Sequence, residues 1–473
     1  MTSNLKKLSK INRPARASVF YTLTSALERG TSFIFTPIFT RILSPSEYGL
    51  YPLYTSALGI MSVVISLELG GGVIYRALSA RDKGEEKVVI GSALTLLSLC
   101  SGAFLFLFTL FPTLGQILFS LDRVTLIYMS AQIFLNGVLA IYFSGCRYSY
   151  DYKPPSVINV LLAILSPSIS YLIIKLSSIR AEGRIVGTLI ASALVALPVL
   201  TRLIRSTGIS LRTMRELLFS ALPILPHFLA TSVILQSGKL VIGRYFGEGA
   251  LAKYSLVFSL GFIFTVVTAG VGSGLTPWIT RKLSVGAEHA VDIMTERLFS
   301  LFAALTLIGV TFMPEGLKVL APPEYREALG AVYPISMSVL LSLLGTVLYS
   351  IAIYYKKGGL VSILSVTTAI VTLGLHMSLT RIFGYGAAAV IQCVASLLTV
   401  LSYAFILSGV LKKHSFKAKE YVKTFLSALF FATLLYIFRE ELLPRILLAL
   451  AFTVMLIPRT VSCYRLIKEG EKR

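Results

Sequence analysis

Long apolar segments recur along the whole chain, and they limit its fold more than any other feature. Stretches of about 20 residues return every 25 to 40 residues or so, which is long enough for a helix to cross a bilayer. Only 14% of the 473 residues are charged, against roughly a quarter in soluble proteins. The sequence therefore predicts an all-α polytopic membrane protein and excludes an ordinary soluble domain.

Two sets of six apolar segments and a final pair can be placed on the chain. The first set is predicted at 18–41, 48–75, 88–111, 124–144, 156–174 and 185–201. The second set is predicted at 217–243, 254–278, 298–313, 328–353, 360–380 and 386–408, and the pair at 421–438 and 444–462. We expect about 14 transmembrane helices, in two pseudo-symmetric six-helix lobes plus a C-terminal helix pair.

Basic segments mark the predicted boundaries between these parts. A basic N-terminus (1–17) precedes the N-terminal lobe (18–201), and a basic linker (202–216) leads to the C-terminal lobe (217–410), the extra helix pair and a basic tail (411–473). Most lysines and arginines fall in loops on one side, which the positive-inside rule places in the cytoplasm. We therefore expect both termini to be cytoplasmic, at the cytoplasmic membrane of the cell, whether the helices number 12 or 14.

The formal net charge of +22 would suggest a nucleic-acid partner in a soluble protein. In a membrane protein, cations that stay near the cytoplasmic phosphates explain it better. We expect the lipid bilayer and no nucleic acid among the partners. The four cysteines are scattered without a CxxC pair, so they indicate neither a disulfide framework nor a zinc site.

The two sets of six segments share small residues at matching places, which suggests an internal repeat. The same residue type recurs 200 positions later at three places: Gly70, Gly72 and Arg81 correspond to Gly270, Gly272 and Arg281. Internal repeats that meet at a midplane site are common in transporters.

The first predicted helix carries a polar face with a cation at its centre. Its residues Thr22, Ser25, Arg29, Ser32 and Thr36 are three or four positions apart and so share one side. A mid-bilayer arginine costs at least roughly 3 kcal/mol, so Arg29 needs a partner: an anionic ligand in a wet cavity, or carbonyls of neighbouring helices. The adjacent Glu28 points about 100° away around the helix and cannot be assumed to pair with it.

Other helices repeat this pattern with neutral polar residues. In the seventh, Ser232, Gln236 and Lys239 share a face, and Lys239 either meets an anionic ligand or extends to the headgroups. Further polar positions in predicted helices are Gln132, Asn136 and Gln392. At any single neutral polar position, hydrogen bonding between helices is the simpler reading. Only their sum favours a hydrophilic lumen.

Two titratable residues are candidates for coupling or gating. Glu68 precedes a run of three glycines near the cytoplasmic end of the second helix, and His376 lies deep within the eleventh. Either could carry a proton. The alternatives are an interfacial carboxylate paired with loop cations, and a neutral histidine bonded to a neighbouring hydroxyl. We expect no cofactor, and the sequence does not choose between entry of a coupling ion, H⁺ or Na⁺, and removal of the product outside as the source of energy.

The sequence lacks the motifs of the enzymes that this size and charge would otherwise allow. No GxxxxGK[ST] or HExxH occurs, the aspartates are isolated, and the histidines form no ligand cluster, so we expect no metal site. The predicted outer loops are short, which leaves little room for the external catalytic loop of a membrane polymerase. We expect a protein that is not an enzyme.

Two short motifs carry a resemblance to a known family. Residues 43–51 read LSPSEYGLY and residues 320–328 read LAPPEYREA. With the layout of helices, the chain resembles the polysaccharide-transporter branch, the oligosaccharide flippases, of the superfamily that also contains multidrug extruders and the lipid II flippase. The resemblance implies two lobes around a central cavity and the export of an undecaprenyl-diphosphate-linked glycan by alternating access.

Site roles follow from that reading, and two other functions stay open. Arg29, with Lys239 as the weaker candidate, would attract the diphosphate, while neutral polar faces accommodate an O-antigen, capsule or exopolysaccharide repeat unit. Glycosyltransferases and a glycan polymerase would be its partners. An ion-coupled exporter of organic cations would favour carboxylates over arginine, and a lipid II flippase would be expected to hold several arginines in its lumen.

Overall fold

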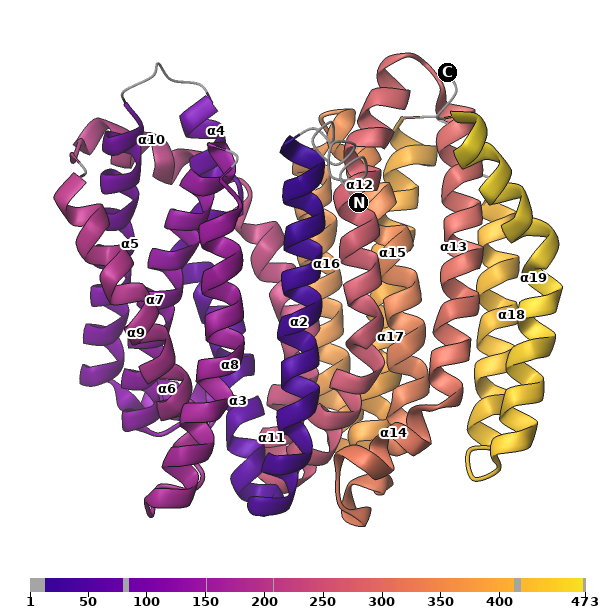
Figure 1. The fold of residues 1–473 in the computed structure, drawn as a ribbon, viewed down its shortest axis with the longest axis horizontal. Helices are drawn as coiled ribbons and strands as arrows, with labels where there is room; N and C mark the ends of the chain where they lie inside the picture. Colours follow the sequence, from indigo (N-terminus) through magenta and orange to yellow (C-terminus); the bar gives the residue numbers. More distant parts are fainter. Residues whose placement is uncertain (1–12, 80–84, 150, 207, 412–417, 471–473) are drawn as a thin grey trace, which may run out of the picture. The chain divides into compact units, whose positions relative to one another are not determined.

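The computed structural model describes residues 13–79, 85–149, 151–206, 208–411 and 418–470 (Figure 1). These residues form helices joined by turns, with no strand among them, as the sequence predicts. They divide into two compact units, Met1–Ala252 and Lys253–Arg473.

Unit 1 is built from long helices with shorter ones between them. The long helices are α2 (Arg13–Ile42), α3 (Pro45–Ser66), α5 (Glu86–Leu110), α7 (Arg123–Tyr148), α8 (Lys153–Leu176), α9 (Gly183–Ser206) and the first part of α11 (Leu225–Gly261). The short ones are η1 (Leu69–Gly71), α4 (Val73–Ser79), α6 (Pro112–Phe119) and α10 (Leu211–Ala221). Buried leucine, isoleucine and valine side chains from α4, α5, α7 and α10 form one hydrophobic core of this unit.

Unit 2 has the same character and ends in the predicted helix pair. Its elements are η2 (Phe262–Phe264), α12 (Thr265–Ser284), α13 (Glu288–Thr311), α14 (Met313–Leu320), η3 (Pro323–Ala331), α15 (Val332–Tyr354), α16 (Gly358–Leu375), η4 (His376–Thr380), α17 (Arg381–Phe405), η5 (Ile406–Val410), α18 (Ala418–Ile437) and α19 (Leu442–Gly470). Both α18 and α19 pack against α13.

Ten helical segments among the described residues are long and apolar enough to cross a membrane. Two of them, Leu225–Thr268 and Gly358–Val410, contain 44 and 53 residues, whereas about 20 residues suffice for one crossing. Each is interrupted by one glycine, Gly247 with φ 80° and Gly384 with φ 70°. Glycine adopts this left-handed conformation without strain, so the chain can turn there. The count of about 14 crossings stays a prediction.

The boundary between the units differs from the predicted linker at 202–216. It falls after Ala252, inside the predicted C-terminal lobe, because the first part of α11 packs on α3 of unit 1. The Ser232 hydroxyl donates a hydrogen bond of 2.8 Å to the carbonyl oxygen of Gly59. A side chain at Gly59 would lie 3.2 Å from the Gln236 amide, so glycine allows this close approach.

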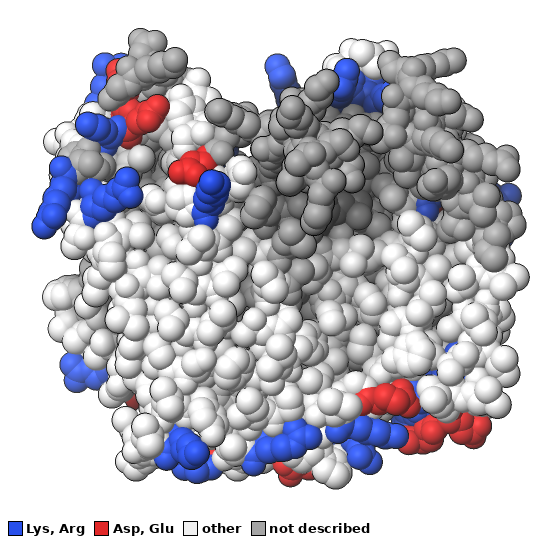
Figure 2. Space-filling model, in the orientation of Figure 1, with Lys and Arg blue, Asp and Glu red and all other residues white. Residues whose placement is uncertain are grey.

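Large apolar side chains are exposed along the middle of the helices. Leu99, Ile164 and Leu194 are 59%, 51% and 58% exposed. Figure 2 shows charged side chains gathered near the ends of the helices on the visible face, with other residues between. This distribution is expected of helices whose middle sections lie in hydrocarbon.

Candidate functional site

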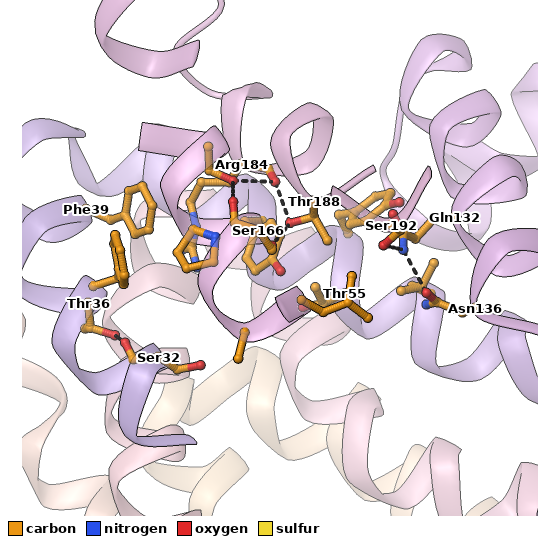
Figure 3. A pocket seen from close by; sticks show the side chains of 18 residues that line it. Ser32, Thr36, Phe39, Thr55, Gln132, Asn136, Ser166, Arg184, Thr188 and Ser192 are labelled. Atoms are coloured by element: carbon orange, nitrogen blue, oxygen red, sulfur yellow. Dashed lines mark hydrogen bonds between the residues drawn. The ribbon is translucent and has the colours of Figure 1, made fainter. Parts of the chain in front are cut away.

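Five helices of unit 1 line a cavity of about 350 Å³ (Figure 3). Its polar lining residues come from α2, α3, α7, α8 and α9: Ser32, Thr36, Tyr51, Tyr54, Thr55, Gln132, Asn136, Ser166, Ser170, Arg184, Thr188 and Ser192. Its apolar lining residues are Phe35, Phe39, Leu58, Leu162, Ala163 and Pro167. Among the residues whose side chains the structure describes, the lining therefore holds one cation and no carboxylate.

The cation is Arg184, in the first turn of α9, and three aromatic rings surround it. Its guanidinium carbon lies 4.0 Å from the ring centre of Tyr51, 4.7 Å from that of Phe39 and 4.9 Å from that of Tyr48. Ring faces attract cations, by about 0.5–1 kcal/mol at exposed sites and more where water is excluded. Rings carry no net charge, so they position the guanidinium without neutralising it.

The turn between α2 and α3 places two of these rings. Ser44 caps α3, because its hydroxyl accepts a hydrogen bond from the Glu47 amide at 3.3 Å, and the Glu47 carboxylate accepts one from the Ser44 amide at 2.8 Å. This capping box starts the helix. Tyr48 and Tyr51 follow one turn apart on the same face of α3. The motif at 43–51 therefore builds one wall of the Arg184 site.

An ion pair ties the connection between α8 and α9 to this turn. Arg180 Nε lies 2.8 Å from Glu47 Oε1, and the same guanidinium donates to the Ile42 carbonyl oxygen. The pair is partly exposed, so its own contribution is small. Its effect is to hold Arg180, four residues before Arg184, and so to position the start of α9.

Gly49 in the same motif permits a close approach to α11. A Cβ atom at this position would lie 1.9 Å from the Glu248 carbonyl oxygen and 2.5 Å from the carbonyl carbon. Because both are backbone atoms, a side-chain rotation cannot relieve the clash. We expect Gly49→Ala to lower the free energy of unfolding by about 1–3 kcal/mol.

Thermal or denaturant unfolding of the purified variant tests this expectation. Gly102→Ala in α5 is the matched control, because nothing lies within 4 Å of the added methyl group. An alanine in a helix is more favourable than glycine by about 0.8–1 kcal/mol, so the control should be no less stable than wild type. Equal stability of the two variants would contradict the close contact.

Away from Arg184, the lining is a network of amides and hydroxyls. Gln132 Nε2 donates to Ser192 Oγ at 2.8 Å and to Asn136 Oδ1 at 2.9 Å. Ser166 and Thr188 share a hydrogen bond of 2.9 Å. Figure 3 shows Gln132 and Asn136 on the opposite side of the view from Phe39 and Thr36.

Three buried polar atoms in the lining have no hydrogen-bond partner among the described residues. They are Arg184 Nη1, Tyr54 Oη and Gln132 Oε1. A buried group left without a partner costs about 1–3 kcal/mol. A ligand or water in the cavity would offset these costs.

One family model matches a part of the chain that includes the cavity of unit 1. A family model described as "Polysaccharide biosynthesis protein" matches residues 15–283, which is more than half of the sequence. The chain belongs to this family. The matched residues include all five helices that line the cavity.

Solved structures of membrane transporters share the fold. An inward-facing MATE family multidrug resistance transporter of the MOP superfamily has 16% identity and a TM-score of 0.66, over 82% of this chain and 96% of its own. The lipid II flippase MurJ in its inward closed conformation has 15% identity and a TM-score of 0.67, over 94% and 100%. A MOP superfamily transporter from Pyrococcus furiosus has 15% identity and a TM-score of 0.59, over 85% and 97%. No curated protein matches the sequence.

Family and fold together identify a multi-pass membrane protein of the polysaccharide biosynthesis family, with the fold of the solved transporters. Among the residues that the structure describes, no group of three or more histidine, cysteine, aspartate or glutamate side chains could hold a metal ion.

Four of the predicted lumen residues lie together in the cavity. Ser32 and Thr36 reach it from α2, and Gln132 and Asn136 from α7. Four other predicted residues fall outside the described side chains, although their backbone belongs to α2: Thr22, Ser25, Glu28 and Arg29. Their predicted roles stay predictions.

The predicted residues of α11 are not among those that line this cavity. Ser232 and Gln236 contact Gly59 of α3, as described above. Lys239 Nζ lies 3.4 Å from Gln236 Oε1. Lys239 is therefore positioned by its own helix, one turn after Gln236.

The remaining predicted positions lie elsewhere. Glu68 follows α3 in a left-handed turn, with φ 49°. In unit 2, His376 is fully buried in the π-helical turn η4, and its Nδ1 lies 3.0 Å from Thr380 Oγ1. Gln392 in α17 is 3% exposed. None of the three lines the cavity of unit 1.

Arg184 was not among the predicted site residues, because it lies in the connection between the predicted helices 156–174 and 185–201. The signal was present in the spacing of Arg184, Thr188 and Ser192, which places all three on one face of α9. This polar face, like that of the first helix, is typical of a helix that borders a hydrophilic cavity.

Proposed function

We propose that this protein is a flippase that moves an undecaprenyl-diphosphate-linked oligosaccharide from the inner to the outer leaflet of the cytoplasmic membrane by alternating access. The observation that carries the proposal is the lining of the cavity in unit 1, where one guanidinium stands among hydroxyls and amides without a carboxylate. Family membership supports a role in polysaccharide biosynthesis.

The chemistry of such a substrate suits this lining. The glycan headgroup is rich in hydroxyls and carries negative charge, so crossing the hydrocarbon unaided would cost many kcal/mol. Hydroxyls and amides replace water around sugar hydroxyls, and a guanidinium attracts an anion. The lipid tail stays in the bilayer during transfer. Arg29, with Lys239 as the weaker candidate, is proposed to attract the diphosphate.

Export of organic cations is the less favoured function. A cation site needs carboxylates, and among the 18 lining residues none is acidic. The lining instead places a fixed positive charge where an organic cation would have to bind, and like charges repel at short range.

The direction and energy of transport belong to the same proposal. Inward flow of H⁺ or Na⁺, or removal of the product outside by a glycan polymerase, would make net export favourable. The termini would face the cytoplasm, where glycosyltransferases assemble the substrate. The glycan itself would cross without chemical change, so no enzymatic activity is proposed.

Reconstitution tests the function directly. Purified protein in liposomes that contain undecaprenyl-diphosphate-linked oligosaccharide should expose the glycan on the opposite leaflet, measured by a lectin or glycosidase that acts only from outside. Protein-free liposomes are the control, and mass analysis should show unchanged chain length. Leaflet exchange no faster than in the control would contradict a flippase, and longer glycans would indicate a polymerase.

A further inference from the structure

The cavity of unit 1 has a buried end and an exposed end. Phe39 and Tyr48, beside Arg184, are only 2% and 6% exposed, and Arg184 Nη1 has almost no contact with solvent, while Arg184 and Tyr51 as whole residues are partly exposed. Ser32 and Asn136, which line the cavity away from these rings, are exposed. A ligand that enters past Ser32 and Asn136 therefore meets the guanidinium with its leading group.

This direction of entry limits which anion can reach Arg184. The diphosphate of a lipid-linked glycan is substituted on both sides, by the lipid and by the first sugar, so it cannot be the leading group on this route. A group at a free end of the glycan can. The carboxylate of a sugar acid and a phosphate monoester on a terminal sugar share this property, and both match the planar donor edge of a guanidinium.

The size of the cavity fits one sugar residue. Its volume of about 350 Å³ lies at the small end of ligand pockets, which span about 300–1,000 Å³. Arg184 and Ser192 are eight residues apart on α9, or about 12 Å along the helix axis. Gln132 forms a hydrogen bond with Ser192, so its amide lies near the Ser192 end of this distance.

The three unpartnered atoms complement such a sugar. Arg184 Nη1 is a donor for an anionic oxygen, and Gln132 Oε1 is an acceptor for a sugar hydroxyl two turns away. Tyr54 Oη, in the same lining, can both donate and accept. Apolar side chains in the same lining, Phe35 and Leu58, suit the C–H face of a pyranose ring.

We propose that this cavity binds one anionic sugar at a free end of the transported glycan, with its charged group on Arg184 and a hydroxyl on Gln132. The inference rests on the proposed function and narrows it, because it selects glycans that end in, or branch to, an acidic sugar. Unit 1 then recognises the glycan separately from the diphosphate.

Binding of small probes to the purified full-length protein tests the site. We expect glucuronate or glucose 6-phosphate, or both, to bind at least about tenfold more tightly than glucose and than inorganic phosphate, measured by calorimetry or saturation-transfer NMR. The tighter of the two acids tells whether a carboxylate or a phosphate monoester is the natural group. Arg184→Gln should reduce the preference for acid over glucose to less than about twofold.

Two further variants separate this site from nonspecific charge effects. Gln132→Leu should weaken acidic and neutral sugars alike. Lys175→Gln removes an exposed cation near the end of α8 and should leave the preference unchanged. Equal binding of all four probes, no binding of either acid, or a preference that survives in Arg184→Gln would overturn the inference.

The failure of the proposed function and the failure of this inference are distinguishable. Wild-type protein that flips lipid-linked glycans but shows no preference for acidic sugars overturns the inference alone. Protein that binds acidic sugars through Arg184 but flips no lipid-linked glycan overturns the flippase proposal, and of the inference only the sugar site is left, without a transported glycan.

Discussion

Transport of undecaprenyl diphosphate that carries a glucuronyl-glucose disaccharide is expected to slow at least about tenfold in Arg184→Gln. A hydrogen bond to a charged group contributes about 1.5–3 kcal/mol, and 1.4 kcal/mol corresponds to a factor of ten in affinity. The measurement is the rate of leaflet exchange in liposomes at substrate concentrations below saturation, where the rate reports affinity.

A neutral glycan provides the matched substrate for this prediction. Transport of the same lipid with a glucosyl-glucose disaccharide should change less than about twofold in Arg184→Gln, because this sugar offers Arg184 no charge. We expect the free energy of unfolding to change by no more than about 1 kcal/mol, since the lost ring contacts are offset by removal of an unpartnered buried N–H group. If transport of both glycans slowed equally, Arg184 would not distinguish an acidic sugar from a neutral one.

Arg445→Leu is expected to destabilise unit 2 by about 1–3 kcal/mol, because it leaves the buried Thr311 carbonyl oxygen without its donor, while solvent screens the partly exposed Glu315. Arg445 in α19 is 1% exposed, and its guanidinium lies 2.5 Å and 3.0 Å from the two carboxylate oxygens of Glu315 in α14. It also donates to the Thr311 carbonyl oxygen at the end of α13. Denaturant unfolding of the purified variant in detergent measures the change.

An exposed arginine and a double variant serve as controls for this pair. Arg439→Leu removes a partly exposed pair with Glu440, 3.5 Å apart, and should cost less than about 1 kcal/mol. Arg445→Leu combined with Glu315→Gln should cost less than the sum of the two single changes, because no charge is left without its partner. Additive losses would mean that the two residues act separately.

The same pair should make stability depend on acidity. Hydrogen bonds from Arg445 hold the pKa of Glu315 below its ordinary value of 4.5. A carboxylate whose pKa is lowered on folding contributes stability that is fully present above its unfolded value and is lost as the pH falls through its folded value. In Glu315→Gln this part of the acid dependence should disappear.

The helices could be predicted from the sequence, because apolar segments of bilayer length are unmistakable. The grouping of helices could not be predicted as well. Charge at 202–216 suggested a boundary there, whereas the first part of α11 belongs with unit 1. What decides this is the contact of Gly49 and Gly59 with α11, and a glycine's close neighbour is not visible in a single sequence.

Some of the neutral polar residues of the cavity could be predicted from the sequence, whereas its cation, Arg184, could not. Ser32, Thr36, Gln132 and Asn136 stood out because polar residues within apolar segments need a reason. Arg184 lies at the edge of its segment, where arginines are usually solvated, so its position indicated nothing by itself. Only the aromatic rings from the ends of two other helices, brought near by the Ser44 turn, make it part of the cavity.

The three rings around one guanidinium also constrain how this site can evolve. Phe39 comes from the last turn of α2, and Tyr48 and Tyr51 come from the first turns of α3. Without the guanidinium, the faces of the three rings would border an empty space and would lose their packing contacts unless the helices moved closer together. Relatives with a neutral residue in place of Arg184 should therefore have lost the tyrosines as well, and an alignment of family members sorted by glycan acidity would show these four positions varying together.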